Sequence, residues 1–543
     1  MQRQTSNFGQ KTMTKKILFG ALLLLMGSSC SAEDITVRYN GAKAKVQQAV
    51  KDSVTVTVEG AYVQIESLYR EHKLTVKLTG KSDDGQLVLK TAGKAKVKLD
   101  NLKLTSQEGA PLHLKNKKKV EVVATKGTEN TLTITACKDT ANHKAAALWA
   151  KDKLLLSGKG TLNIIATGDG CRGIKNKKDL TIEELTLNVT TSGDNLGEKP
   201  FGFDGFPGGS EGGFPGMPEG GFPGFGNDST RRGGFPGGFP GFANDSTRRG
   251  GFPGGMPPFN FEDIPEEVKQ QFEEMRKRFE ERKGNDSIGG GFPGFPGGPD
   301  GPDGGGFGGK HKYVSPTKGI ASKGKIIFNS GDITVRTSTA GAEGIEGKEG
   351  IAFNGGNIDV LSPDDAINAG ACIEFNGANV LARSTGNDAV DSNPAGGFFP
   401  PFGGHQNQDI DPAIIIRGGT VYAWSQVGSP EEGLDCDFAP LVLEGGNVFT
   451  VGGGMGEMPS VPTNETASQP TVLLIGLNVE KDEPIMIYDG SGTLLNTVTV
   501  PFSMRRSASL VSYPAFKVGS TYTVKTKGYE KTFTLNENFT TVR

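Results

Sequence analysis

The chain has 543 residues and a formal net charge of −2, so its overall charge favours neither nucleic acid nor an anionic membrane as a partner. Hydrophobic residues make up 35%, which is low for a compact domain, and many of the 81 glycines and 30 prolines gather in one segment. A repetitive β fold with a low-complexity insert accounts for both values. The five cysteines include no Cys-x-x-Cys pair, which argues against a zinc site or a redox dithiol.

Residues 1–29 have the pattern of an export signal, in which two lysines precede an apolar run that is too short to span a bilayer as a helix. The small residues directly before Cys30 resemble the end of a lipoprotein signal peptide. Cleavage there would leave Cys30 as a lipidated N-terminus, whereas the alternative is ordinary secretion. The acidic residues after Cys30 resemble a surface-targeting signal of Gram-negative lipoproteins. We therefore expect an outer-membrane lipoprotein at the cell surface, with a periplasm-facing position as the alternative.

Residues 30–193 predict short strands followed by the first coils of a parallel β-helix. Polar and apolar residues alternate over 54–58, 74–78 and 95–99, which is the period of a half-buried strand. Further on, the aliphatic residues Leu148 and Ile174 lie 26 positions apart. A spacing of this size indicates a solenoid, because inward side chains of one coil pack on those of the next.

Residues 194–311 predict a disordered insert. Repeats of Gly-Gly-Phe-Pro-Gly dominate this segment and cannot build a packed core. One helix is expected near 265–283, because a proline and two glutamates begin it and four apolar residues share one face. This helix either docks on the fold or, alternatively, pairs with a partner helix.

Three tripeptides in the insert resemble the O-glycosylation sequon of one group of Gram-negative bacteria. Each has an aspartate followed by a serine and then a threonine or an aliphatic residue. Modification requires an exposed segment, which a disordered insert provides. The candidate acceptors are Ser229, Ser246 and Ser287, and chance occurrence is the alternative.

Residues 312–455 carry a four-fold repeat of acid, Gly or Ala, aliphatic residue, and acid or amide. The aliphatic residues step from 345 to 367 to 390, a period that again predicts solenoid coils. Coils stack about 4.8 Å apart, so the acids should form two columns. The first column contains Glu343, Asp365, Asp388 and Glu432, and the second contains Glu346, Asn368, Asp391 and Asp435.

These two columns predict a calcium site. Ca²⁺ takes about six to eight oxygens from carboxylates, amides and carbonyls, and the Gly or Ala between the acids leaves carbonyls accessible. The alternative is that Asp, Asn and Gly merely favour turns. Earlier coils carry Arg172, Lys175 and Lys318 at these positions, which restricts the prediction to the later coils. The candidate ligands are Glu343, Glu346, Asp364, Asp365, Asn368, Asp388, Asp391, Glu431, Glu432 and Asp435.

A second row of outward side chains predicts a carbohydrate-binding face. Arginine grips carboxylates in a fork, and aromatic rings offer a flat face to sugar rings. The candidates are Arg336, Arg383, Tyr422, Trp424 and Phe449. Alternatively, these side chains pack beneath the insert or beneath residues 468–543, which predict a small antiparallel β element that caps the solenoid.

No catalytic residue is predicted. The five histidines are scattered, and no nucleophile elbow, metalloprotease motif or phosphate loop occurs. A uronate lyase would need calcium to acidify the sugar and a base, for which Arg383 or Lys348 are conceivable. The pattern itself selects neither residue.

Several stretches resemble the family of carbohydrate-binding domain-containing lipoproteins: residues 109–112, 127–132, 168–170, 173–175, the Asn-Gly-Gly turns and the tail at 519–524. The resemblance covers most of 50–193 and 312–530. It implies a right-handed, pectate-lyase-like parallel β-helix that binds calcium and acidic plant polysaccharide without established catalysis.

Together these observations predict a monomeric, lipid-anchored cell-surface protein. It would bind an acidic, pectin-like polysaccharide with Ca²⁺ as its cofactor, without catalysis. The alternatives are a calcium-dependent uronate lyase and a structural or adhesive surface protein that acts through the glycine-rich insert.

Overall fold

The computed structural model describes residues 33–138, 145–194, 317–393, 413–436, 439–453 and 459–543. These residues form strands, turns and irregular segments, with no helix among them, so the all-β prediction is confirmed for this part of the chain. Accordingly, none of them lies in a helix able to cross a membrane. The predicted signal peptide, Cys30, the helix at 265–283 and the three candidate serines lie outside the described residues.

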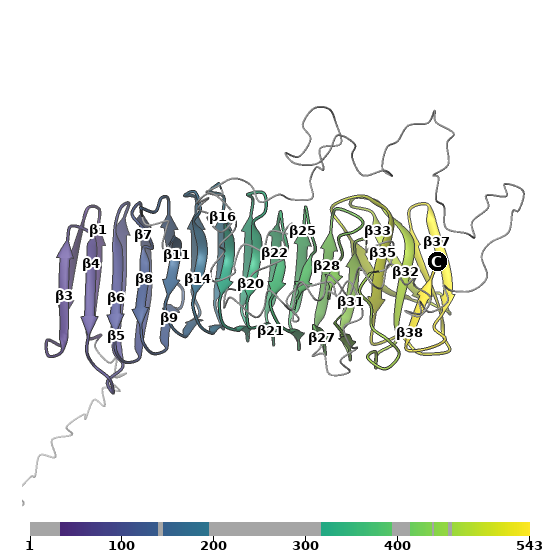
Figure 1. The fold of residues 1–543 in the computed structure, drawn as a ribbon, viewed down its shortest axis with the longest axis horizontal. Coiled ribbons are helices and arrows are strands. Elements are labelled where there is room, and N and C mark those ends of the chain that lie inside the picture. Colours follow the sequence, from purple (N-terminus) through teal and green to yellow (C-terminus); the bar gives the residue numbers. More distant parts are fainter. Residues whose placement is uncertain (1–32, 139–144, 195–316, 394–412, 437–438, 454–458) are drawn as a thin grey trace, which may run out of the picture. The chain divides into compact units, whose positions relative to one another are not determined.

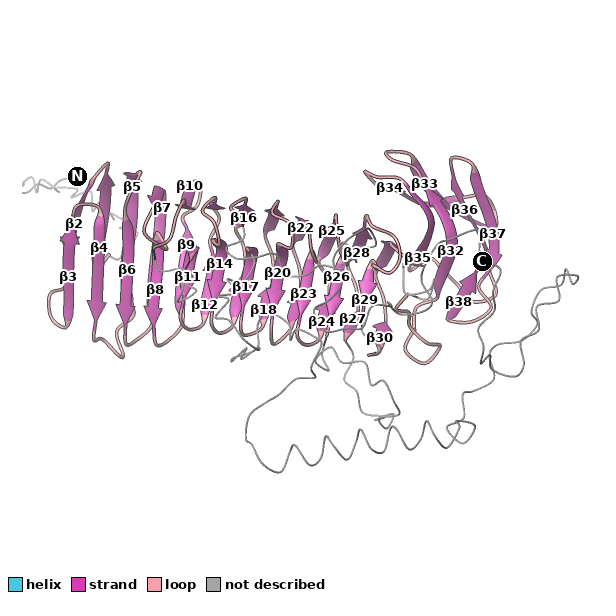
Figure 2. Cartoon of the chain, turned by 45° about the horizontal axis from the view of Figure 1, so that its top comes forward, coloured by secondary structure: helices cyan, strands magenta, loops and turns pink. Residues whose placement is uncertain are grey.

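Parallel strands form three ladders, and from β8 to β28 each strand pairs with the strand three places further along the chain. Figures 1 and 2 show these strands following one another in chain order. The first ladder belongs to a sheet of 11 strands, which we call sheet B and in which the first pair, β3 and β4, is antiparallel. Its strands are β3 (Val54–Glu59), β4 (Tyr62–Ser67), β6 (Gln86–Thr91), β8 (Leu112–Asn116), β11 (Ala146–Ala150), β14 (Arg172–Asn176), β17 (Lys318–Ser322), β20 (Glu343–Gly347), β23 (Ile367–Ala369), β26 (Val390–Ser392) and β29 (Leu434–Asp435).

The other two ladders belong to the 23-stranded sheet. The second ladder contains β9 (Val120–Ala124), β12 (Leu154–Ser157), β15 (Leu180–Ile182), β18 (Ile326–Phe328), β21 (Ile351–Phe353), β24 (Ile373–Phe375), β27 (Ile414–Ile416) and β30 (Leu441–Leu443). The third contains β10 (Glu129–Ile134), β13 (Thr161–Ala166), β16 (Thr186–Thr191), β19 (Asp332–Thr337), β22 (Asn357–Ser362), β25 (Asn379–Ser384), β28 (Thr420–Ser425) and β31 (Asn447–Val451). The same sheet includes the N-terminal strands β1 (Ile35–Asn40), β2 (Lys43–Gln48), β5 (Leu74–Ser82) and β7 (Ala95–Ser106).

The repeat spacing in the sequence becomes strand register in the structure. Leu148 lies opposite Ile174, and Ile345 lies opposite Ile367, which in turn lies opposite Val390. Because the period equals one set of three strands, aliphatic side chains stack into buried columns. The pairing of β14 with β17 continues the ladder across residues 195–316.

Aromatic stacking and glycine turns reinforce the ladders. The rings of Phe328, Phe353 and Phe375 stack on successive strands with centroids 5.0 and 5.1 Å apart. The turn before β22 needs Gly356, whose φ is +95° and where a Cβ would meet the carbonyl oxygen of Gly331 at 2.6 Å.

The remaining strands form what we call the C-terminal element. They are β32 (Thr471–Val479), β33 (Pro484–Asp489), β34 (Leu494–Thr499), β35 (Met504–Ser512), β36 (Thr521–Thr526), β37 (Tyr529–Thr534) and β38 (Phe539–Val542). β35 pairs antiparallel with β31, the last strand of the third ladder, through Val448–Ser512 and Phe449–Val511. This pairing covers part of the edge that β31 would otherwise expose.

Candidate functional site

Neighbouring strands of sheet B position the acidic residues. Register places Glu346 opposite Asn368, Asn368 opposite Asp391, and Asp391 opposite Asp435. Strands β20, β23, β26 and β29 therefore carry the second column in the predicted alignment, and Figure 2 shows them side by side.

Backbone hydrogen bonds align the first column in the same way. The amide of Gly344 donates to Asp365 O at 3.0 Å, that of Ala366 to Asp388 O at 3.4 Å, and that of Ala389 to Glu432 O at 3.0 Å. The small residues after each acid permit this close approach. We call the two sets of acidic side chains, together with the flanking Asp364 and Glu431, the acidic columns.

Most side chains of the acidic columns are removed from water. Glu346 and Asp365 are only 3% and 4% exposed, and Asp388, Asp391 and Glu432 are also buried. Burial of a charged carboxylate is costly unless a cation or hydrogen-bond donors compensate it. The compensation differs from one strand to the next.

At β20 the compensating cation is a lysine. The buried Nζ of Lys318 lies 3.1 Å from Glu343 Oε1 and 2.6 Å from Glu346 Oε1, and Lys348 Nζ also lies 2.6 Å from Glu346 Oε1. Burial alone would raise the pKa of Glu346, but the two lysines outweigh it and lower that pKa to about 2. Burial raises the pKa of Glu343 to about 7, because Lys318 offsets it only in part.

At β23 and β26 the acids lack such a cation. In the described part of the chain, no Lys, Arg or His forms an ion pair with Asp365 or Asp388. Burial, followed by the charges of neighbouring carboxylates, raises the pKa of Asp365 well above its usual range. Burial likewise raises the pKa of Asp388 to about 9, although the amide of Glu432 donates a hydrogen bond to it.

Amides partly compensate these carboxylates. The Nδ2 of Asn368 donates to Asp365 Oδ2 at 2.8 Å and to Asp391 Oδ2 at 3.2 Å, which bridges the two columns. Asn387 donates to Asp364 Oδ1 at 2.8 Å. Among the described residues, however, the buried oxygens Asp365 Oδ1 and Glu343 Oε2 have no hydrogen-bond partner.

Near β29, the last strand of sheet B, hydrogen-bond donors already engage the acidic side chains. The amide of Ser460 donates to Glu432 Oε2 at 2.6 Å, and its hydroxyl donates to Asp435 Oδ1 at 3.2 Å. Across the residues that the structure describes, no three His, Cys, Asp or Glu side chains are grouped so that they could hold a metal ion. The columns thus hold carboxylates close together but do not present a finished metal site.

Earlier strands of sheet B carry the opposite charge. Lys318 lies opposite Glu343 in the register, and Lys175 lies one strand before Ala321, which lies opposite Glu346. Arg172, Lys175 and Lys318 are all buried. The restriction of acids to the later strands therefore reflects a change of sign along one sheet.

The predicted carbohydrate-binding row is only partly accessible. Arg336 Nη2 lies 2.5 Å from Asp359 Oδ2, and Arg383 Nη2 forms an ion pair with the other oxygen of the same carboxylate. Sequence reasoning missed Asp359, although its place on the strand between the two arginines would have signalled it. Both arginines are half-buried and share the single carboxylate of Asp359, which balances only one of their two positive charges.

The aromatic members of that row lie against the C-terminal element. Trp424 and Phe449 are 5% and 0% exposed and pack in a cluster with Val511 and Leu474. Their burial fits the alternative in which they pack under the C-terminal strands, and it removes both from a sugar-contacting role. Tyr422 remains half-buried, and its hydroxyl accepts a hydrogen bond from Asn496 Nδ2 at 3.2 Å.

The described part of the chain contains four cysteines. Cys137 and Cys372 are half-buried, and Cys171 and Cys436 are buried. No disulfide links these four residues.

One family model matches parts of this chain. A model of the family described as carbohydrate-binding domain-containing protein matches residues 50–199 and 307–389. The matched ranges include Glu343, Asp365 and Asp388 of the acidic columns and end before Asp391. No curated protein matches this chain.

One solved structure is similar, a polysaccharide lyase-like protein from C. thermocellum in its gadolinium derivative. The two chains are 15% identical with a TM-score of 0.37, and the similarity covers 66% of this chain and 94% of that one.

Proposed function

We propose that this chain is a non-catalytic polysaccharide-binding protein in which the acidic columns and the carboxylates of an acidic polysaccharide share Ca²⁺. The family match supports carbohydrate as the ligand class. The observation that carries the proposal is the pair of buried carboxyls, Asp365 and Asp388, which have no ion-pair partner in the described chain. A divalent cation would relieve their repulsion.

The fold that we propose is a right-handed parallel β-helix in which the three ladders are the three faces of the coil. The register of all three ladders supports this reading, since each strand from β8 to β28 pairs with the strand three places further on. In such a coil the acidic columns would run along one edge. A polymer with regularly repeated carboxylates suits a row of equivalent positions.

The residues present fit calcium better at β23 and β26 than elsewhere. Lys318 already forms ion pairs with Glu343 and Glu346, and Ser460 donates hydrogen bonds to Glu432 and Asp435. Asp365, Asn368, Asp388 and Asp391 remain, and the unpartnered Asp365 Oδ1 is a buried oxygen of the kind that a hard cation takes. When bound, Ca²⁺ would supply positive charge between these residues and the sugar acid.

An incomplete set of protein ligands is consistent with a shared ion. Calcium takes about six to eight oxygens, more than these residues supply from their side chains alone. Water and sugar carboxylates would complete the coordination. Binding of the polysaccharide would therefore depend on calcium, and binding of calcium would strengthen with polysaccharide.

The proposed location is the outer membrane, where a lipid on Cys30 would anchor the mature chain at the cell surface. The small residues before Cys30 and the preceding apolar run support this part of the proposal. Mass spectrometry of the native protein tests it, since an unmodified N-terminus would contradict lipidation.

The decisive experiment measures binding of the mature chain to polygalacturonate and a glycan array, with calcium and with a chelator. We expect binding that the chelator abolishes and added Ca²⁺ restores. Asp365→Asn and Asp388→Asn should weaken it, whereas Asp332→Asn should not, because that exposed carboxylate lies on β19 and pairs with an amide. Binding that persists unchanged in chelator would break the link between the acidic columns and recognition.

The same samples test the lyase alternative through the absorbance of unsaturated product. We expect no product, because both conceivable bases are engaged in ion pairs, Arg383 with Asp359 and Lys348 with Glu346. Sustained calcium-dependent product formation would replace the binding proposal with an enzymatic one.

A further inference from the structure

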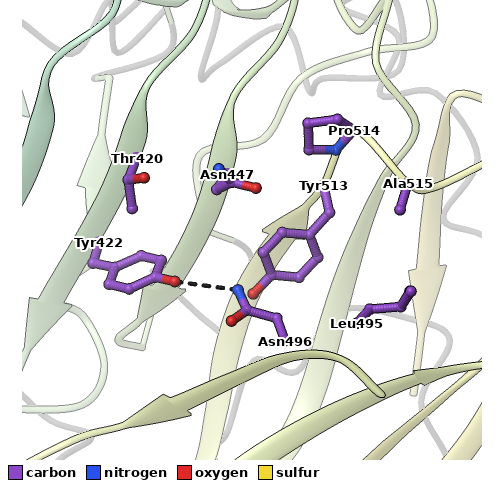
Figure 3. A pocket seen from close by; sticks show the side chains of 8 residues that line it. All are labelled: Thr420, Tyr422, Asn447, Leu495, Asn496, Tyr513, Pro514 and Ala515. Carbon is purple, nitrogen blue, oxygen red and sulfur yellow. Dashed lines mark hydrogen bonds between the residues drawn. The ribbon is translucent and has the colours of Figure 1, made fainter. Parts of the chain in front are cut away.

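A cavity of about 400 Å³ lies between the end of the third ladder and the C-terminal element. Its volume falls within the range of about 300–1,000 Å³ that is typical of small-molecule sites. Figure 3 shows the side chains that line it, and none of them is charged. They are Thr420, Tyr422, Asn447, Leu495, Asn496, Tyr513, Pro514 and Ala515.

Two polar side chains of the cavity come from an interrupted amide ladder. On the preceding strands, Asn357 Nδ2 donates to Asp332 Oδ1 at 2.8 Å, and Asn379 Nδ2 donates to Asn357 Oδ1 at 2.9 Å. The register continues from Asn379 to Thr420 and then to Asn447. Threonine has no amide, so the ladder stops there.

The interruption leaves side-chain donors and acceptors that are not used within the ladder. Within the described chain, neither the Thr420 hydroxyl nor the Asn447 amide forms a side-chain hydrogen bond, and both residues line the cavity. At the equivalent positions, Asn379 Nδ2 donates to Asn357 Oδ1, and Asn357 Nδ2 donates to Asp332 Oδ1. The end of the ladder therefore differs from its beginning in having free donors and acceptors next to a hollow.

The opposite wall comes from the C-terminal element and is preformed. Tyr422 and Asn496 point toward one another across the cavity and are hydrogen-bonded (Figure 3). Tyr513 is buried and forms part of the wall. The hydroxyl of Tyr522 accepts from the amide of Lys517 at 2.8 Å and donates to Ala515 O at 3.3 Å, which fixes the loop after Tyr513.

We propose that this cavity binds a neutral sugar unit. Its lining combines aromatic rings and apolar carbons with hydroxyl and amide groups that both donate and accept, which matches the alternating faces and hydroxyls of a sugar ring. A charged sugar would be left without a counter-ion there, which is costly in a partly buried site. The proposal rests on the proposed function for its ligand class but places the contact away from the acidic columns.

The test titrates the mature chain with cellobiose, xylobiose, galactobiose and digalacturonate and follows binding by saturation-transfer difference NMR. We expect at least one neutral disaccharide to bind in chelator as well as in calcium. Asn447→Ala should weaken that binding about five- to tenfold, the scale of one lost hydrogen bond. Thr420→Val, which keeps the side-chain volume, should weaken it in the same direction.

The matched control is Asn357→Ala, which removes the same side chain from the same register position three strands earlier in the ladder. It should leave disaccharide affinity within about twofold, since its amide serves only the ladder. Absence of binding by all three neutral disaccharides, or equal losses in Asn447→Ala and Asn357→Ala, would overturn the proposal.

Failure here is distinguishable from failure of the proposed function. Asp365→Asn should lose calcium-dependent binding to polygalacturonate while it retains the neutral disaccharide. Asn447→Ala should show the converse. If digalacturonate alone binds, and Asn447→Ala does not affect it, the cavity is not the site and the acidic columns remain the candidate.

Discussion

The two charged faces of this protein treat carboxylates in different ways. On β22, Asp359 lies between Arg336 of β19 and Arg383 of β25, which neutralise it from both neighbouring strands. On sheet B, Asp365 and Asp388 each lie two residues before the adjacent strands β23 and β26, and in the described chain no basic side chain pairs with either. In both cases, the pairing of neighbouring parallel strands decides which charged side chains lie next to one another.

The comparison teaches that stacking by itself does not decide whether an acidic position needs a ligand. Where bases flank an acid along a ladder, the carboxylate is compensated within the protein, whereas repetition of acid yields a row that gains from an added cation. The change occurs within sheet B itself, since Lys318 pairs with Glu343 and Glu346 just before the carboxyls without an ion pair begin.

The largest expected effect tests this internal lysine. Lys318→Met should destabilise the protein by about 3–5 kcal/mol, because removal of one partner of a buried ion pair leaves the other charge buried. Lys325→Met is the control, since Lys325 Nζ lies 2.6 Å from Glu374 but is 38% exposed. It should cost less than about 1 kcal/mol. Urea denaturation measures both, and equal losses would contradict the role given to Lys318.

The second expected effect concerns calcium. At a hundredfold excess over its dissociation constant, Ca²⁺ should stabilise the wild-type protein by about 2.7 kcal/mol. Asp365→Asn should lose most of that gain, because it removes the buried oxygen that lacks a partner. Asp359→Asn, on the neutralised face, should retain it. Thermal unfolding with and without calcium gives the comparison, and a gain that is the same in all three proteins would contradict the assignment.

The acidic columns were predictable from the sequence because they depend only on the spacing of the repeat. The spacings between Ile345, Ile367 and Val390 fix which residues lie opposite one another, and parallel pairing adds nothing that the repeat does not contain. The same holds for the acids that flank these anchors. Stacking, alternation and the all-β class all follow from such local patterns.

The burial of the predicted carbohydrate-binding row beneath the C-terminal element was not predictable in the same way. Phe449 becomes buried because it lies opposite Val511, which is 62 residues further along the chain and on an antiparallel strand. No repeat connects the two. The role of Lys318 was also missed. In the sequence, a base at a position where other coils carry an acid is a departure from the repeat, whereas in the structure this lysine is the counter-ion of Glu343.

The third expected effect is on the pH dependence of stability in chelator. Burial raises the pKa of Asp388 to about 9 in the folded chain, against an ordinary value of 3.8. The folded state therefore holds a proton that the unfolded state releases, so this stability is full below pH 3.8 and declines as the pH rises toward 9. We expect a loss of at least about 1.4 kcal/mol, the equivalent of one pKa unit.

Asp388→Asn provides the control for that pH profile, because an amide does not titrate. Its stability should vary less between these pH values, and Ca²⁺ should flatten the wild-type profile by pairing with the carboxylate. A steeper decline in Asp388→Asn than in the wild type would show that other groups set the profile.

The smallest expected effect tests the neutralised face. Asp359→Asn should change stability by less than about 1 kcal/mol, since its ion pairs are partly exposed. It also releases Arg336 and Arg383 from their shared carboxylate. If that face can contact an acidic glycan, affinity for polygalacturonate at low salt should rise in Asp359→Asn and fall again in Asp359→Asn/Arg383→Gln. Unchanged affinity in both variants would restrict recognition of acidic sugar to the acidic columns, where carboxylates, and not arginines, face the ligand through calcium.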